Sequence, residues 1–519
     1  MALDKTVHFE TLGCRLNQIE TEGAAEFFSD SGWLVQMKSA AAKDAEDKSV
    51  CLCVLNTCAV TGKAEQKARR TINLLLKKFP AAALIVTGCY AQLSQSQIAA
   101  MDERIAVLPG KAKSALAGVP IFLQRQGTKG AIQTAAALRE HFKKMSGSSP
   151  NMTVQAQEAP QTELLASPKS AAPREQNALQ AQEAPQNPAV AVNPFALNPK
   201  SFFAHSRAAI KIQDGCDNNC SYCAIHFARG KSVSIDAALA LERVAALEAA
   251  GQSEVVLTGV NIGQYRGLWK GQPIDIAGLL ELILTQTKRI AIRFSSIYPQ
   301  TVTERFCDVI KDPRVRPHFH LSVQSGSDAV LARMNRPYKR GAVLQACRRL
   351  KDAKQNPFLA CDIITGFPGE TVQDFDQTLL LLKEAGFVNA HAFPFSPRPG
   401  TAAANYTPKI PERVKDERVA ALNEYSAAAK IAYINSFAGT VRQAVAESAH
   451  GRLAVPAGKA LVHAVTDNFI HAEILLDAPQ GSPAQKTPAP GSPILVKILG
   501  ANEAAIRAGQ EWEATAGLC

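Results

Sequence analysis

Short apolar runs that alternate with helix-compatible stretches constrain the fold of this chain most strongly. The first part of the sequence contains four such runs, and all but the last are followed by a polar stretch that suits a helix: residues 7–13, 49–60, 83–92 and 104–110. Buried strands joined by helices are typical of a parallel sheet. The sequence therefore predicts a small parallel α/β domain over residues 1–126.

The composition changes sharply between residues 127 and 200, where Gln, Ala, Pro, Glu and Ser dominate. The heptapeptide QAQEAPQ occurs twice in this segment, at 155–161 and 180–186. Few aromatic and branched residues are present, so burial cannot offset the entropic cost of ordering the backbone. We expect a disordered insertion, in which only residues 131–145 are compatible with a helix.

The alternation resumes from residue 201 to residue 436. Six apolar runs separated by amphipathic stretches occur here: residues 210–215, 253–261, 289–297, 319–325, 359–367 and 389–396. Six such units predict a (β/α) barrel, open or complete, and their number favours a partial one. Residues 411–437 indicate one helix, and alternation over 437–519 predicts a small β-rich module.

The charge and cysteine content narrow the class of protein. An excess of 57 Lys and Arg over 46 Asp and Glu gives a net charge of +11, which favours a polyanionic partner such as RNA. Asp4 and Glu10 lie near the start, where no basic-then-apolar segment predicts a signal peptide, and no apolar run reaches membrane-spanning length. Twelve cysteines in a chain without a predicted secretion signal indicate a reducing compartment, so we expect the protein in the cytoplasm. Clustered thiols in that compartment are more often metal ligands than disulfides.

The strongest motif is GCDNNCSYC, which places Cys216, Cys220 and Cys223 in the spacing C-x3-C-x2-C. Three thiolates on one loop can hold three irons of a 4Fe-4S cluster and leave the fourth iron open to S-adenosylmethionine (SAM). With Tyr222 before the last cysteine, the motif resembles the signature of the radical SAM superfamily. The alternative is a zinc loop, which requires four closed ligands, and no matching cysteine pair lies nearby.

Three further cysteines, Cys14, Cys58 and Cys89, each follow the end of a predicted strand. In a parallel sheet the carboxyl ends of the strands share one edge where ligands gather, so these thiols can converge. Glycines beside them permit close backbone approach, and polar neighbours can donate hydrogen bonds: Gly13, Gly88, Asn56 and Thr57. The alternative is three core cysteines, the interpretation we give to Cys51 and Cys53 within an apolar strand.

Other candidates belong to the predicted barrel face and to one helix. The candidates for a SAM pocket are the turns at 365–370 and 396–401 and the residues Gln324, Ser325 and Asp362. Thr258 and Asn261 are candidates to contact the methionyl amine of SAM. The alternative for each of them is an ordinary βα turn without a ligand. A basic stretch after Cys58 predicts phosphate contacts or a solvated helix face, through these residues: Lys63, Lys67, Arg69, Arg70, Lys77 and Lys78.

Taken together, the motifs resemble the methylthiotransferase family of radical SAM enzymes over nearly the whole chain apart from 127–200. The segments that carry the resemblance stand in the family's order: TLGCRLNQIETE, NTCAVT, TGCYAQ, KIQDGCDNNCSYCAIHFARG, LTGVNIGQY, VQSGSDAVLARMNR, DIITGFPGET and FPFSPRPGT. Two departures are His226, where the family usually has Pro, and LSVQSG in place of PLQSG.

The resemblance implies an architecture and a chemistry. It implies an N-terminal cluster domain, a radical SAM barrel and a C-terminal β module of the TRAM type that grips RNA. It also implies a second 4Fe-4S cluster on Cys14, Cys58 and Cys89, and two uses of SAM: one to methylate a sulfur on that cluster, one to generate a radical. An external electron donor, such as flavodoxin or ferredoxin, is expected.

Within the family, NTCAVTGKAEQKARR, KIQDGC and CAIHFARG resemble the branch that acts on C2 of N6-threonylcarbamoyladenosine in the anticodon stem-loop of tRNA. The isopentenyladenosine branch and the branch that modifies a ribosomal protein aspartate are the alternatives. From a different class, a non-enzymatic RNA-binding protein stabilised by metal remains a hypothesis.

Overall fold

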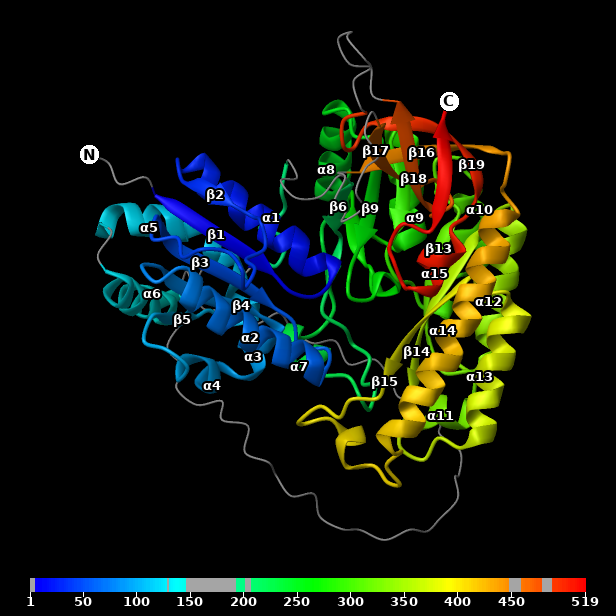
Figure 1. The fold of residues 1–519 in the computed structure, drawn as a ribbon, viewed down its shortest axis with the longest axis horizontal. Coiled ribbons are helices and arrows are strands. Elements are labelled where there is room, and N and C mark those ends of the chain that lie inside the picture. Colours follow the sequence, from blue (N-terminus) through cyan, green and yellow to red (C-terminus); the bar gives the residue numbers. More distant parts are fainter. Residues whose placement is uncertain (1–4, 128–129, 146–192, 201–206, 448–458, 478–487) are drawn as a thin grey trace.

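The computed structural model describes residues 5–127, 130–145, 193–200, 207–447, 459–477 and 488–519. These residues form three folded parts that follow one another along the chain, from the blue sheet through the green and yellow barrel to the red module in Figure 1. Within these ranges, none of the helices combines the length and the apolar character needed to cross a membrane.

The N-terminal part is a parallel sheet with the strand order β2-β1-β3-β4-β5. Its strands are β1 (Thr6–Thr11), β2 (Leu34–Gln36), β3 (Val50–Thr57), β4 (Ala83–Gly88) and β5 (Ile105–Val107). Its helices are α1 (Arg15–Asp30), α2 (Gly62–Lys78), α3 (Cys89–Leu93), α4 (Gln95–Ala99), α5 (Val119–Gln126) and α6 (Ala131–Met145). The predicted parallel domain is confirmed, and the strand missed is β2, a partly exposed edge strand of three residues.

Two segments of the predicted insertion are folded, one near each of its ends. Helix α6 is present as predicted, and it packs its buried residues Ala135, Leu138 and Phe142 into the core of the sheet domain. Leu197 joins the same core, and Phe195 joins the core of the barrel. Residues 131–145 and 193–200 therefore belong to the folded body, because their apolar side chains find a surface to cover. The remainder of 127–200 lies largely outside the described residues.

The central part has two three-stranded parallel sheets, β6-β9-β12 and β13-β14-β15, and isolated parallel bridges at Ile292–Val315 and Ile297–Leu321 connect them into one row of six strands. The strands are β6 (Ala208–Lys211), β9 (Glu254–Thr258), β12 (Ala291–Phe294), β13 (His318–Gln324), β14 (Phe358–Thr365) and β15 (Asn389–Pro394). The helices are α7 (Ile225–Arg229), α8 (Ala237–Ala249), α9 (Ile276–Gln286), α10 (Glu304–Ile310), α11 (Asp328–Arg333), α12 (Arg340–Ala353) and α13 (Val372–Ala385). Within the described part of the chain no pairing joins β15 to β6, so the predicted six-unit partial barrel is confirmed.

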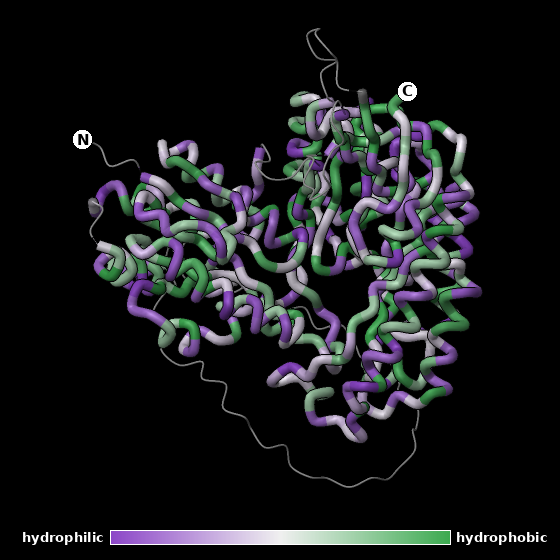
Figure 2. Tube along the Cα trace, in the orientation of Figure 1, coloured by the Kyte–Doolittle hydropathy of each residue, from purple (hydrophilic) through white to green (hydrophobic). Residues whose placement is uncertain are grey.

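The C-terminal part is a small closed barrel with the order β16-β17-β18-β20-β19. Its elements are β16 (Val441–Glu447), β17 (Lys459–Thr466), β18 (His471–Asp477), β19 (Pro493–Ala501), α15 (Glu503–Arg507) and β20 (Ala514–Leu518). The predicted long helix is α14 (Glu412–Asn435), and its last turn packs into the core of this barrel through Tyr433 and Ile434. Hydrophobic segments run through the strands of all three parts (Figure 2).

Candidate active site

All six cysteines selected from the sequence line one cavity of about 470 Å³ between the N-terminal sheet and the barrel. Cys14, Cys58 and Cys89 enter it from the sheet, and Cys216, Cys220 and Cys223 enter it from the loop that follows β6. The convergence expected from the strand ends is therefore present. It also brings the two sets of thiols to opposite sides of a shared space.

The order of the N-terminal strands explains where the first three cysteines lie. The order reverses between β1 and β3, and a parallel sheet opens a crevice at the carboxyl ends of the strands where this occurs. Cys14 precedes α1 just beyond β1, and Cys58 directly follows β3. Cys89 directly follows the neighbouring strand β4 and begins α3.

One hydrogen-bond network connects these three loops. The side-chain amide of Asn17 donates to the carbonyl of Leu12 at 2.8 Å and to that of Thr57 at 3.0 Å. The Thr57 hydroxyl donates in turn to the carbonyl of Thr87 and accepts from the backbone N–H of Ala91 at 3.3 Å. The predicted hydrogen bonding by Thr57 is confirmed, and it joins the loop of Cys58 to that of Cys89.

Two glycines are required where these loops touch. Gly13 has φ +113°, and a Cβ there would lie 2.7 Å from the Cβ of Cys58. Gly88 has φ +99°, and a Cβ there would lie 2.2 Å from the carbonyl oxygen of Thr57. Both contacts are impossible for a larger residue, so the glycines allow loop to approach loop.

Backbone hydrogen bonds and one arginine side chain hold the conformation of the cysteine loop of the barrel. The N–H of Cys216 donates to the carbonyl of Gly230 at 3.0 Å, and the N–H of Cys223 donates to that of Cys220 at 3.1 Å. The buried guanidinium of Arg336 donates to the Cys220 sulfur at 3.4 Å and to the Tyr298 hydroxyl at 3.0 Å. The sequence interpretation missed Arg336, which lies 116 residues from Cys220 in the chain.

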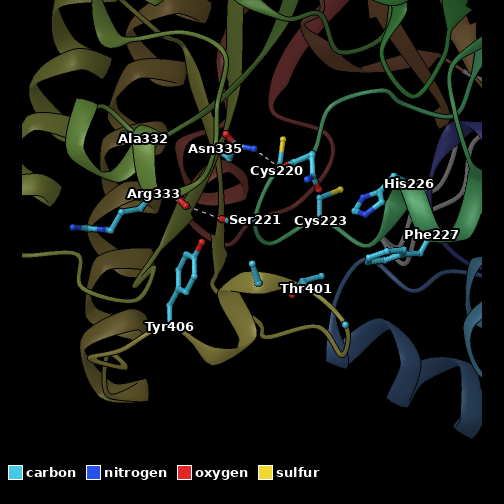
Figure 3. A pocket seen from close by; sticks show the side chains of 13 residues that line it. Cys220, Ser221, Cys223, His226, Phe227, Ala332, Arg333, Asn335, Thr401 and Tyr406 are labelled. Carbon is cyan, nitrogen blue, oxygen red and sulfur yellow. Dashed lines mark hydrogen bonds between the residues drawn. The ribbon is translucent and has the colours of Figure 1, made fainter. Parts of the chain in front are cut away.

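A second cavity, of about 480 Å³, lies on the outer face of the same loop (Figure 3). Cys220 and Cys223 line both cavities, so the loop forms the wall between them. Phe227 and His226 lie on one side of the outer cavity, and Arg333 and Tyr406 on the other. None of its described lining residues is acidic.

The remaining predicted residues divide into two groups. Tyr222, Thr258, Gln324 and Asp362 line the inner cavity, and the Asp362 carboxylate lies 3.0 Å from the His320 ring. Asn261 is not among the lining residues, but its side chain forms a hydrogen bond with the Cys216 thiol, and its backbone N–H donates to Gln213 at 2.8 Å. Ser325 does not line the cavity, because its hydroxyl accepts from the backbone N–H of Ser327 and faces Thr378 of α13.

The basic stretch forms helix α2 as expected, but its cations are not equivalent. Lys78 is buried, and its ammonium group donates to the carbonyl of Asp44, so it is unavailable for phosphate. Its neighbour Lys77 is exposed, as are these residues on earlier turns of the helix: Lys63, Lys67, Arg69 and Arg70.

The donor set fits iron-sulfur clusters. Burial raises the pKa of the Cys58 thiol to about 11 and that of Cys223 to about 12, so metal must displace their protons. Within the described ranges, no three Cys, His, Asp or Glu side chains are grouped closely enough for a single metal ion. Thiolates of a 4Fe-4S cluster bind different irons and stand further apart, which suits three soft ligands around an open cavity.

Ser295 is a cavity residue that the sequence interpretation overlooked. It lines the inner cavity, and among the described residues its buried hydroxyl has no hydrogen-bond partner. An unpaired buried hydroxyl is costly unless a ligand or water satisfies it. Its position one residue beyond β12, at the carboxyl edge of the barrel, was the available sequence signal.

Comparison with known proteins is consistent with this geometry. Residues 6–110 match the family described as Uncharacterized protein family UPF0004, and residues 210–382 match the Radical SAM superfamily. Threonylcarbamoyladenosine tRNA methylthiotransferase MtaB from Treponema pallidum (strain Nichols) is 43% identical over 455 residues, covering 86% of this chain and 92% of that protein.

Two other relatives extend the comparison. The protein of the same name from Thermotoga maritima is 32% identical over 445 residues, covering 85% of this chain and 87% of its own. A tRNA-2-methylthio-N(6)-dimethylallyladenosine synthase from Janthinobacterium sp. (strain Marseille) is 28% identical over 450 residues, covering 86% of this chain and 87% of that protein.

Proposed function

The chain belongs to the family of threonylcarbamoyladenosine tRNA methylthiotransferases, and from this membership we propose that it inserts a methylthio group at C2 of N6-threonylcarbamoyladenosine beside the tRNA anticodon. The observation that carries the proposal is the shared cavity lined by all six cysteines. Greater identity to the threonylcarbamoyladenosine enzymes supports this branch over the dimethylallyladenosine branch. Membership of an enzyme family replaces the hypothesis of a non-enzymatic RNA-binding protein.

The radical SAM domain implies SAM and one 4Fe-4S cluster. We assign Cys216, Cys220 and Cys223 to that cluster, and propose a second cluster on the opposite cysteines, Cys14, Cys58 and Cys89. When bound, these groups supply the electron, the radical and the sulfur that acid-base side chains cannot provide. Because both cysteine sets line one cavity, the two proposed clusters would lie within reach of one adenine ring.

The side chains of the cavity bind and shield the reacting groups. The Ser295 hydroxyl and the Asp362 carboxylate are proposed to bind polar groups of SAM, since both line the cavity and the Ser295 hydroxyl has no hydrogen-bond partner in the described part of the chain. Ile364 and Phe395 contribute apolar wall beside them. Such a wall limits water around the adenine and reduces competing reactions of a radical.

We propose that two parts of the chain hold the RNA. Helix α2 begins four residues after Cys58, so the exposed cations of its first turns, such as Lys63 and Lys67, lie nearest the cavity, where phosphate contacts would position the RNA. The C-terminal closed barrel is proposed to be the TRAM-type module that grips the RNA, supported by its five-stranded β architecture.

The outer cavity is the proposed docking place of the electron donor, a flavodoxin or ferredoxin. Cys220 and Cys223 form its floor, so a carrier seated there approaches the cluster without entering the substrate cavity. Arg333 contributes positive charge, and the described residues that line the cavity include no carboxylate, which suits an acidic carrier. Replacing Arg333→Glu should weaken turnover driven by flavodoxin while turnover driven by dithionite is retained; equal loss of both would contradict this docking place.

Nucleoside mass spectrometry tests the proposed reaction. tRNA from a strain that lacks the gene should contain N6-threonylcarbamoyladenosine without its methylthio derivative, and the complete gene should restore the derivative. Persistence of the derivative in a strain without a paralogue would refute the proposal. Loss of the dimethylallyladenosine derivative, or of the methylthio group on a ribosomal protein, would instead identify one of the two alternative branches.

A further inference from the structure

Arg229 joins the barrel to the N-terminal sheet next to both cysteine sets. It is the last residue of α7, the short helix that follows the cysteine loop of the barrel. Its Nη1 lies 3.0 Å from the Glu20 carboxylate and 2.9 Å from the Asp214 carboxylate, and its Nη2 donates to the Asn17 side-chain oxygen at 2.9 Å. One buried guanidinium therefore contacts α1 of the sheet and β7 (Gln213–Asp214) of the barrel.

The contact with Asn17 determines which way that amide points. An amide presents an acceptor on one side and a donor on the other. Arg229 at 2.9 Å and Lys113 at 3.5 Å both donate to the oxygen, so the NH₂ group faces the carbonyls of Leu12 and Thr57, in the loops of Cys14 and Cys58. The Thr57 hydroxyl carries the connection onward to the loop of Cys89. An interaction made by a barrel residue thus orients all three loops of the sheet.

The surrounding charges favour anionic sulfur at these loops. Lys113 and Lys211 also pair with Glu20, and Lys211 pairs with Asp214, so three cations meet two carboxylates in a buried group. Burial alone would raise the pKa of Glu20, but Arg229, Lys113 and Lys211 hold it well below its usual value. The group therefore keeps a net charge of about +1. Arg229 itself lines the inner cavity together with Cys14 and Cys89.

We propose that Arg229 is a positioning residue for the N-terminal cysteine site: it orients Asn17, through it the loops of Cys14, Cys58 and Cys89, and places positive charge beside their cluster. The inference rests on the proposed function, because it concerns the second cluster assigned there. Arg229 acts through Asn17 and the buried charges. The barrel thus completes a cluster site whose ligands all belong to the sheet.

Two substitutions test the orientation and the charge together, and Arg229→Lys, which keeps the charge, separates them. Asn17→Asp is nearly isosteric and still accepts from Arg229, but it loses the NH₂ group that holds Leu12 and Thr57. Arg229→Gln removes the guanidinium group, with its two sets of donors, and its positive charge. Arg398→Gln is the matched control, because Arg398 also forms a buried ion pair across the two parts, with Glu65 of α2, and among the described residues it has no hydrogen bond or ion pair with a cysteine loop.

Iron content and Mössbauer spectra of the anaerobically reconstituted full chain provide readouts that do not depend on turnover. We expect about eight irons per chain in the parent and in Arg398→Gln, and about four in Asn17→Asp and Arg229→Gln, whose remaining cluster still cleaves SAM. Thiol labelling of metal-free protein should also become faster at Cys58 in both variants.

The outcomes distinguish this inference from the function it rests on. Eight irons and unchanged spectra in Asn17→Asp and Arg229→Gln would overturn the positioning role while leaving the proposed function intact. Four irons in the parent chain would overturn the two-cluster assignment itself. If Arg229→Gln does not fold, Asn17→Asp decides the matter, and Arg229→Lys, which keeps the charge without the fork, should retain intermediate iron.

Discussion

The Nη1 of Arg336 lies 3.4 Å from the sulfur of Cys220 and donates to it from a buried position, with the Tyr298 and Tyr338 rings against its guanidinium at 4.4 Å and 4.8 Å. Cys220 belongs to the loop between the inner and outer cavities. A cation fixed on this sulfur stabilises the reduced, more negative form of a bound cluster.

Arg336→Gln should therefore shift the reduction potential of the barrel cluster in the negative direction. A negative shift of about 60 mV would lower the ratio of reduced to oxidised cluster about tenfold when a weak electron donor sets the potential. Spectroelectrochemical titration measures the potential, and formation of 5′-deoxyadenosine measures the consequence. Arg340→Gln is the control, because Arg340 of α12 pairs with Glu384 and is not among the lining residues of either cavity. An unchanged or more positive potential in Arg336→Gln would show that the contact does not tune the cluster.

The two cysteine sets should have separable roles. Cys220→Ala should abolish SAM cleavage, because it removes one of three ligands of the SAM-binding cluster. Cys58→Ala should leave cleavage within about twofold of the parent and stop sulfur insertion, because it affects only the cluster of the sheet. Chromatography of 5′-deoxyadenosine and mass spectrometry of the tRNA give the two measurements. Equal loss of cleavage in both variants would contradict the division.

Gly88→Ala should destabilise the sheet domain more than an equivalent change elsewhere. A Cβ at Gly88 would meet the Thr57 carbonyl at 2.2 Å, whereas at Gly32, with a similar φ of +78°, it would meet nothing within 4 Å. Gly32→Ala therefore costs only the backbone strain, about 1 kcal/mol, and Gly88→Ala adds a clash worth roughly 1–3 kcal/mol. Thermal unfolding should show a lower Tm for Gly88→Ala, with lost iron. Matching Tm values would mean that the loops relax freely.

Glu254→Gln should loosen the C-terminal barrel from the central one. The buried Glu254 carboxylate lies 2.7 Å from Arg293 and 2.9 Å from Arg316, which donate onward to the Thr466 carbonyl and to Gln443 of the C-terminal barrel. Losing the carboxylate leaves two buried cations, a cost of roughly 3–5 kcal/mol. Thermal unfolding at pH 7 measures the effect, and Glu281→Gln in an exposed pair with Arg305 should change little.

The same carboxylate gives this effect a pH dependence. Burial would raise the pKa of Glu254, but Arg293 and Arg316 lower it to about 2, below its usual 4.5. Its stabilisation is therefore complete above pH 4.5 and is lost as the pH falls towards 2. The difference in Tm between the parent and Glu254→Gln should stay constant from pH 7 to 4.5 and narrow below it. A difference that persists undiminished at pH 3 would indicate another origin.

The sequence alone determined those features that depend on neighbours along the chain. The apolar runs predicted the parallel sheet and the six-unit barrel, because burial of a strand between helices leaves a local pattern. The spacing of Cys216, Cys220 and Cys223 indicated a cluster loop, because the three ligands share one turn of backbone. Strand ends also predicted that Cys14, Cys58 and Cys89 converge, since a parallel sheet gathers its carboxyl ends at one edge.

Tertiary structure decided which side chains orient those ligands. Arg336 reaches Cys220 across 116 residues, and Arg229 reaches Asn17 across 212. Neither arginine belongs to a motif, and an arginine in a sequence is most often a surface residue. Only the folded barrel buries Arg336 against a sulfur and Arg229 against an amide. Ser325 failed as a cavity residue for the same reason, because its hydroxyl turns towards α13. Ligand spacing is local and readable, whereas the groups that hold the ligands are set by packing between distant parts of the chain.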